Sequence, residues 1–122
     1  MQTEIEGIWL MVRAELDGEI APDLVVAKSR IEFAAGRYET RFGHEAGDRG
    51  TFVVGGEPEQ GTIDLKVVAG PNRGRIIPCI FQRRGDRLRI CFGLDGVAPA
   101  GFSTAPGQQR YLVTYRLQAG TP

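Results

Sequence analysis

Apolar and polar residues alternate along most of the chain, in short runs that glycine and proline interrupt. The clearest run covers residues 37–42, with Tyr38, Thr40 and Phe42 on one face and three charged residues on the other. Alternation with a period of two is typical of a strand with one buried face. On this basis we predict eight strands, over residues 7–15, 30–34, 37–42, 50–54, 62–68, 75–83, 87–92 and 111–118.

Glycine and proline occur so often that few helices can form. The longest interval without either covers residues 23–35, and its second half alternates like a strand. Proline suits the first turn of a helix, so we predict one short helix that begins near Pro22 and Asp23. The connections between strands are short and rich in glycine, at residues 35–36, 43–50, 55–61, 70–74 and 84–85, and one longer loop covers residues 93–109.

Each predicted strand must hide its apolar face. One short helix cannot cover a sheet of eight strands, whereas closure into a barrel covers the apolar faces and leaves no unpaired edge. The short sequential hairpins favour an up-and-down antiparallel barrel over the alternative, a two-sheet sandwich. We therefore predict an all-β fold in which residues 1–122 form a single eight-stranded barrel domain, with one short helix after the first strand.

The charge balance excludes some partners. The chain has 15 basic and 15 acidic residues, so its formal net charge is zero at pH 7. Nucleic acids and anionic membranes attract a basic excess, and we expect neither as a partner. No run approaches the roughly 20 apolar residues that span a bilayer, and the first six residues include acids where a secretory signal has basic residues. We expect a soluble cytoplasmic protein.

Residue types that catalyse reactions or bind metals are scarce. The two cysteines, Cys79 and Cys91, and the single histidine, His44, are too few for a zinc site or a disulfide scaffold. Neither Ser29 nor Ser103 stands in the G-x-S-x-G pattern of a nucleophilic serine. We therefore assign no catalytic residue, no metal site and no cofactor. Haem ligation by His44 is a weak alternative, because the chain offers no second histidine.

The two cysteines lie on neighbouring predicted strands. A two-residue turn at positions 84–85 would pair Cys79 with Ile90 and Phe81 with Leu88, all on one apolar face. Cys91 would then point to the opposite face. We expect two free thiols, with Cys79 as a small core residue.

The start of the first predicted strand, Gly7-Ile8-Trp9, matches the G-x-W signature of lipocalins. Beyond this signature the chain resembles a bacterial lipocalin-like domain family of uncharacterised proteins. Its landmarks follow in order along nearly the whole chain: Asp17-Gly18, Gly36-Arg37-Tyr38, Gly50-Thr51-Phe52, Ile63-Asp64-Leu65, 70–74, Ile80-Phe81, 85–88, Ile90-Cys91-Phe92 and 99–103.

The resemblance implies a small lipocalin-like barrel, and it brings no agreed reaction or ligand. It also implies that Arg116 on the last strand packs across Trp9, where a cation–π contact would close one end of the barrel.

The inner face of the predicted barrel is aromatic with few polar groups, as in a pocket for lipophilic molecules. We expect the lumen to bind a small apolar or aromatic molecule. A packed core has the same composition, so a cavity above about 300 Å³ would favour a ligand and tight filling would favour another function. The candidate ligand-binding residues are Phe33, Tyr38, Thr40, Phe42, Phe52, Cys79, Phe81, Ile90 and Phe92.

The alternative is a protein-interaction or accessory domain with a filled core. Residues 1–64 carry a net charge of −7 and residues 65–122 carry +7, which would favour a homodimer or an acidic protein partner. The basic residues for such a contact are Arg73, Arg75, Arg83, Arg84, Arg87 and Arg89. A cofactor-free isomerase or cyclase, with hydroxyls such as that of Tyr38 polarising a folded substrate, is the least favoured alternative.

Overall fold

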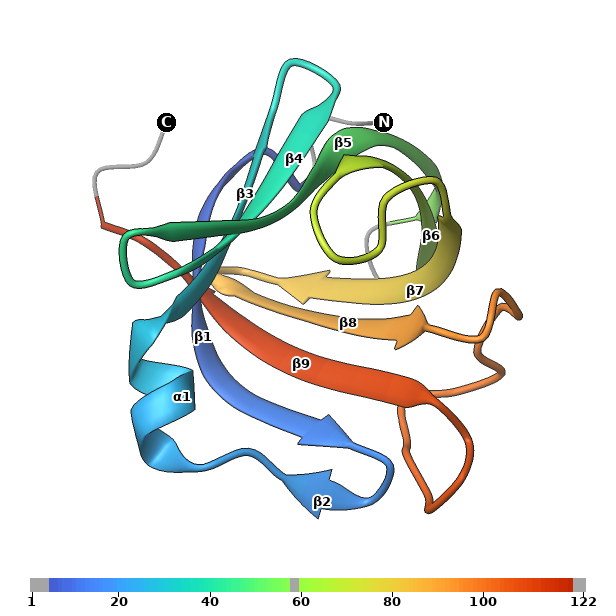
Figure 1. Cartoon of the computed structure of the whole chain (residues 1–122). Coiled ribbons are helices and arrows are strands. Elements are labelled where there is room, and N and C mark those ends of the chain that lie inside the picture. The colour runs from blue at the N-terminus through green and yellow to red at the C-terminus, as the bar shows by residue number, and fades with distance from the viewer. Residues whose placement is uncertain (1–4, 58–59, 120–122) are drawn as a thin grey trace.

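The computed structural model describes residues 5–57 and 60–119, and these are mostly β-structure (Figure 1). The single helix of this part, α1, covers Asp23–Lys28, where the sequence predicts it. Residues 58 and 59, within the predicted connection 55–61, lie outside the described residues, as do the two ends of the chain. The strands are β1 (Gly7–Leu16), β2 (Glu19–Ile20), β3 (Ser29–Ala34), β4 (Arg37–Phe42), β5 (Glu45–Glu57), β6 (Gln60–Ala69), β7 (Ile76–Arg84), β8 (Arg87–Gly93) and β9 (Arg110–Leu117).

The sheet closes on itself. From β3 to β9 each strand pairs antiparallel with the next, β1 pairs with β3, and β9 pairs back onto β1. These pairings form an eight-stranded up-and-down barrel and confirm the predicted fold class. The short strand β2 is an addition that pairs only with the end of β1. In Figure 1, α1 and β2 lie beside the same end of the barrel.

Seven of the eight predicted strands agree with the structure to within two residues at each end. The exception is β5, which begins at Glu45 rather than at Gly50, because the chain reverses at Gly43 and His44. The strand continues through a bulge in its pairing with β4, where the Asp48 amide donates to Thr40 Oγ1 at 2.9 Å. The glycines in this segment led to the prediction of a loop, but in the structure they belong to a strand with a bulge.

Gly50 has a specific steric role in β5. It pairs with Tyr38 of β4, and a Cβ at Gly50 would overlap the backbone carbonyl of Lys66 on β6. The absence of a side chain lets the strands approach closely beside the Tyr38 ring.

The predicted register between β7 and β8 is wrong by two residues. The turn consists of Gly85 and Asp86, so Phe81 pairs with Ile90 and Cys79 pairs with Phe92. Because side chains alternate with a period of two, a shift of two residues preserves the inner face. Cys79 therefore faces the core, Cys91 faces outward, and both thiols are free, as predicted.

Although Cys91 faces out of the barrel, it is buried. The loop between β8 and β9 covers it, with the Ser103 backbone hydrogen-bonded to the thiol. The same loop places the Phe102 ring centroid 3.9 Å from the guanidinium carbon of Arg89. The longest loop is thus folded back onto the outer face of β8.

One end of the barrel is filled around Trp9, which is completely buried. Its indole Nε1 donates to the backbone carbonyl of Ile5 at 2.8 Å. The guanidinium over the ring, 5.0 Å from its centroid, belongs to Arg83 of β7. The contact with Arg116 that the resemblance implies is therefore wrong. Arg116 pairs with Leu10, the outward-facing neighbour of Trp9, so its side chain points to the exterior.

Candidate ligand-binding cavity at the open end of the barrel

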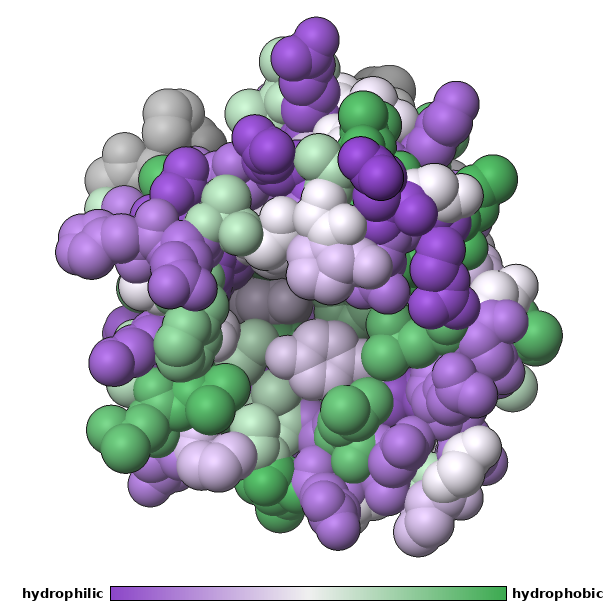
Figure 2. Space-filling view, in the orientation of Figure 1, coloured by the Kyte–Doolittle hydropathy of each residue, from purple (hydrophilic) through white to green (hydrophobic). Residues whose placement is uncertain are grey.

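Opposite the Trp9 end, the interior of the barrel is hollow. A cavity of about 600 Å³ lies inside the barrel, and every barrel strand contributes to its wall. Helix α1, strand β2 and the residues that join them border its opening. Figure 2 shows a hollow near the centre of this view, with green hydrophobic residues gathered beside it over α1.

Apolar side chains form most of the wall and the rim. At the rim, Phe42 is 46% exposed and Ile20 is 59% exposed, although both are large and apolar. Such residues around a hollow mark a surface that favours contact with apolar molecules. The apolar lining residues are Met11, Leu16, Ile20, Ala21, Pro22, Val25, Phe42, Leu65, Ile77, Phe92 and Leu94.

The predicted ligand-binding residues divide between the two ends of the barrel. Those that line the cavity are Tyr38, Thr40, Phe42 and Phe92. The others belong to the packed core and do not line it: Phe33, Phe52, Cys79, Phe81 and Ile90. In that core the Phe33 and Phe52 rings meet edge to face, with centroids 4.9 Å apart. The alternation predicts the inner face for all nine, but a period of two cannot show how deep a residue lies along the barrel axis.

All three tyrosines of the chain line this one cavity, namely Tyr38, Tyr111 and Tyr115. Burial raises the pKa of each hydroxyl above its ordinary value, and for Tyr38 the charge of Asp48 raises the pKa further. The hydroxyls are therefore neutral at physiological pH. The cavity thus combines a mainly apolar wall with three neutral hydroxyls, and four charged residues also line it: Glu19, Arg30, Arg41 and Asp48.

The Tyr38 hydroxyl is buried without a hydrogen-bond partner among the described residues. The residue is 4% exposed, and its ring centroid lies 6.4 Å from that of Phe33. Buried polar atoms in native proteins nearly always have a partner, so this atom requires an explanation.

A small network beside Tyr38 is satisfied within itself. Asp48 accepts a hydrogen bond from the Asn72 backbone amide at 2.9 Å and another from the Asn72 side-chain amide at 2.7 Å. Thr40 Oγ1 accepts from the Asp48 amide. These contacts join the β4–β5 hairpin to the connection between β6 and β7, and they fix the wall of the cavity.

The arginines of the cavity wall have acidic partners. Arg30 lies 3.4 Å from a carboxylate oxygen of Glu32, and Arg41 lies 2.8 Å from one of Glu39. Each pair joins residues two positions apart on one strand. These contacts compensate part of the positive charge near the opening.

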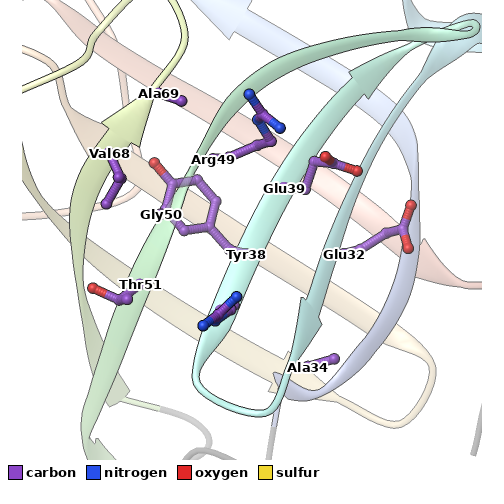
Figure 3. A pocket seen from close by; sticks show the side chains of 10 residues that line it. Glu32, Ala34, Tyr38, Glu39, Arg49, Gly50, Thr51, Val68 and Ala69 are labelled. Carbon is purple, nitrogen blue, oxygen red and sulfur yellow. The ribbon is translucent and has the colours of Figure 1, made fainter.

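A second hollow, of about 660 Å³, lies on the outer face of β3–β6 (Figure 3). Its charged side chains are two acids, Glu32 and Glu39, and two arginines, Arg37 and Arg49, so it concentrates neither sign. Figure 3 shows the Tyr38 ring extending from β4 past Gly50 toward β6. Tyr38 lines both hollows and thus belongs to the wall between them. The inner cavity is the better candidate because barrel walls surround it.

The basic zone expected from the sequence is divided in the structure. Arg73 and Arg75 precede β7, whereas Arg84 ends β7 and pairs with Arg87, so the two pairs lie at opposite ends of a nine-residue strand. Arg83 packs over Trp9 on the inner face, and Arg89 contacts Phe102. The six arginines therefore do not form one continuous surface.

The structure also places the histidine and a serine that the sequence raised as candidate functional residues. His44 is exposed at the β4–β5 turn, and Ser29 Oγ donates to the Val25 carbonyl at 2.7 Å. Among residues 5–57 and 60–119, no cluster of three or more His, Cys, Asp or Glu side chains could hold a metal ion. Within the same ranges, no helix is long and apolar enough to cross a membrane.

Several cavity residues escaped the sequence analysis. Tyr111 and Tyr115 alternate with Val113 on the last strand, and this pattern could have placed them on the inner face. Asp48 and Asn72 stand in glycine-rich segments that predict loops, and only the bulge and the fold bring them together. No pattern in the sequence predicts the contact between Asp48 and Asn72.

Comparison with protein-family models, curated proteins and solved structures finds no match to this chain. The resemblance to a lipocalin-like family therefore stays a prediction. The cavity itself is the basis for a functional proposal.

Proposed function

We propose that the protein binds a small, mostly apolar molecule in the cavity at the open end of its barrel. The observation that carries this proposal is a hollow of about 600 Å³ inside the barrel, with a mainly apolar and aromatic wall. Small-molecule sites typically have volumes of about 300–1,000 Å³, apolar walls and a few placed polar groups. The alternative, a barrel whose interior is entirely filled by side chains, describes only the end around Trp9.

We also propose that the chain is a lipocalin-like barrel. The eight-stranded meander supports this assignment, as does Trp9, which lies in β1 at the filled end beneath a guanidinium. In this proposal the Trp9 end is structural and the opposite end is the binding site. Native mass spectrometry of the protein purified from its own host would reveal a retained small molecule.

A neutral fluorescent probe, N-phenyl-1-naphthylamine, tests the binding proposal directly, because its emission rises when it leaves water. We expect saturable binding of one probe per protein. The variant Ala21→Phe should weaken binding by about tenfold or more, because Ala21 lines the cavity and a phenyl ring there would occupy the space of the probe.

The matched control is Ala100→Phe. Ala100 is exposed in the loop between β8 and β9 and does not line the cavity, so this variant adds the same ring elsewhere. It should bind the probe as the wild type does. Equal affinity of the wild type and Ala21→Phe, or no binding by the wild type, would show that the cavity is not a binding site.

A further inference from the structure

Asp48 carries a negative charge on the inner side of the barrel wall. Of the two hollows, Asp48 lines only the inner cavity, whereas the next residue, Arg49, lines only the outer one. Neighbouring residues of a strand point to opposite faces in this way. The charge of Asp48 also raises the pKa of Tyr38, whose ring belongs to the same wall. The carboxylate therefore faces the interior of the barrel.

The charge of Asp48 has no counter-charge in the part of the chain that the structure describes. Its carboxylate accepts hydrogen bonds from the backbone amide and the side-chain amide of Asn72, and both donors are neutral. No basic side chain of residues 5–57 and 60–119 forms an ion pair with it. Asp48 is only half-buried, so part of it stays accessible. A carboxylate offers about four acceptor positions, and two of them remain open to a further donor or cation.

The positive charges of the wall are compensated on its outer side. On β3 the buried residue Ile31 faces inward, so Arg30 and Glu32 belong to the outer face, where they pair across to Arg41 and Glu39 of β4. The two guanidinium groups lie 3.4 Å and 2.8 Å from carboxylate oxygens of these acids. Both acids line the outer hollow and not the inner cavity. An anion inside the barrel would thus find no uncompensated cation in this wall.

The rest of the lining also favours a positive ligand. Glu19 of β2, at the opening, is exposed, and no described basic residue forms an ion pair with it. Phe92 and Tyr111 both line the cavity, and their ring centroids lie 5.5 Å apart. The faces of aromatic rings attract ammonium groups. Negative charge and aromatic rings therefore occur together in one mainly apolar cavity.

We propose that the ligand is a mainly apolar cation, an amine or quaternary ammonium compound whose positive nitrogen lies beside the Asp48 carboxylate. This inference rests on the proposed function and adds the chemical class of the ligand. The apolar part of the ligand fills the cavity between the aliphatic and aromatic side chains. The charge decides which end of the ligand enters first, because the acceptor for it stands at one position of the wall.

Three probes of nearly equal shape test this proposal: (2-naphthylmethyl)trimethylammonium, 2-neopentylnaphthalene and 2-naphthylmethanesulfonate. The first two differ only in a positive nitrogen that replaces a quaternary carbon, and the third carries a negative charge at the same place. Displacement of N-phenyl-1-naphthylamine gives the affinity of each probe for the wild type and for Asp48→Asn. The matched control is Asp64→Asn, because Asp64 is exposed on β6 and does not line the cavity.

We expect the wild type to bind the ammonium probe at least about tenfold more tightly than the sulfonate. Asp48→Asn should lower the ammonium-to-hydrocarbon affinity ratio by about tenfold, because it removes the attractive charge and keeps the size of the side chain. Its affinity for the neutral hydrocarbon should stay within about twofold of the wild type, which shows that the cavity is intact. Asp64→Asn should leave the ratio unchanged.

Two results would overturn the proposal. The first is sulfonate binding as tight as that of the ammonium probe in the wild type, a comparison that needs no variant and so does not depend on the folding of Asp48→Asn. The second is a change in the ammonium-to-hydrocarbon ratio below about twofold in Asp48→Asn.

The outcomes separate this inference from the function on which it rests. If the wild type binds N-phenyl-1-naphthylamine and Ala21→Phe does not, but either of these two results is found, the cavity binds ligands and the preference for a cation is wrong. If Ala21→Phe binds the dye as the wild type does, or no probe binds, both proposals fail.

Discussion

Removing the Tyr38 hydroxyl should stabilise the ligand-free protein. In Tyr38→Phe the ring keeps its packing against Phe33, and the only atom lost is an oxygen with less than 1 Å² exposed and no partner among the described residues. An unsatisfied buried polar group costs about 1–3 kcal/mol. We take the lower end of this range.

We therefore expect the free energy of unfolding to rise by about 1 kcal/mol in Tyr38→Phe. For a chain of this length such a gain raises Tm by roughly 3–5 °C. Urea denaturation and calorimetry on ligand-free protein would measure both quantities. Tyr111→Phe is the matched control, because Tyr111 also lines the cavity but is only half-buried, and its stability should stay within about 0.5 kcal/mol of the wild type.

The opposite sign would refute the reasoning. If Tyr38→Phe lost more than about 1 kcal/mol of stability, the hydroxyl would have a hydrogen-bond partner within the protein. The Tyr38 hydroxyl would then not be an unsatisfied buried group.

Three further outcomes test the packing and the electrostatics. Gly61→Ala should destabilise the fold by about 2 kcal/mol in urea denaturation, because its Cβ would overlap the Phe81 ring, whereas Gly101→Ala, with nothing within 4 Å of its Cβ, should be neutral. Arg83→Ala should shift the fluorescence emission of the single tryptophan to longer wavelength, because water would reach the filled end of the barrel. Arg116→Ala should leave the emission unchanged, because Arg116 points to the exterior. Equal emission spectra of the two variants would contradict the contact between Arg83 and Trp9. Folding raises the pKa of all three tyrosines, so the unfolded chain loses these protons at lower pH than the folded protein does. The free energy of unfolding should therefore fall above about pH 10, as the pH rises toward the folded pKa values. The fall is at most about 1.4 kcal/mol per pH unit for each tyrosine. Alkaline unfolding curves and tyrosine absorbance near 295 nm would measure this, and ordinary titration near pH 10 in the folded protein would contradict it.

Local patterns in the sequence determined the strands and their inner faces. The alternation at Tyr38 and Thr40, or at Ile63 and Leu65, depends only on the two-residue repeat of an extended chain. Glycine-rich turns between such runs leave an up-and-down meander as the simplest arrangement, and closure follows because the apolar faces must leave water. Because these signals are local, the sequence predicted the fold class, the short helix after the first strand and the two free thiols of Cys79 and Cys91.

The tertiary structure alone decided how the interior is divided. The sequence predicts an inward position for both Phe33 and Phe42, yet Phe33 is packed in the core and Phe42 is half-exposed at the rim. Likewise Arg83, and not Arg116, covers Trp9. The two-residue repeat fixes the face of a side chain and carries no information on its depth along the barrel, which depends on the stagger of all eight strands, on the turn at 85–86 and on the bulge in β5.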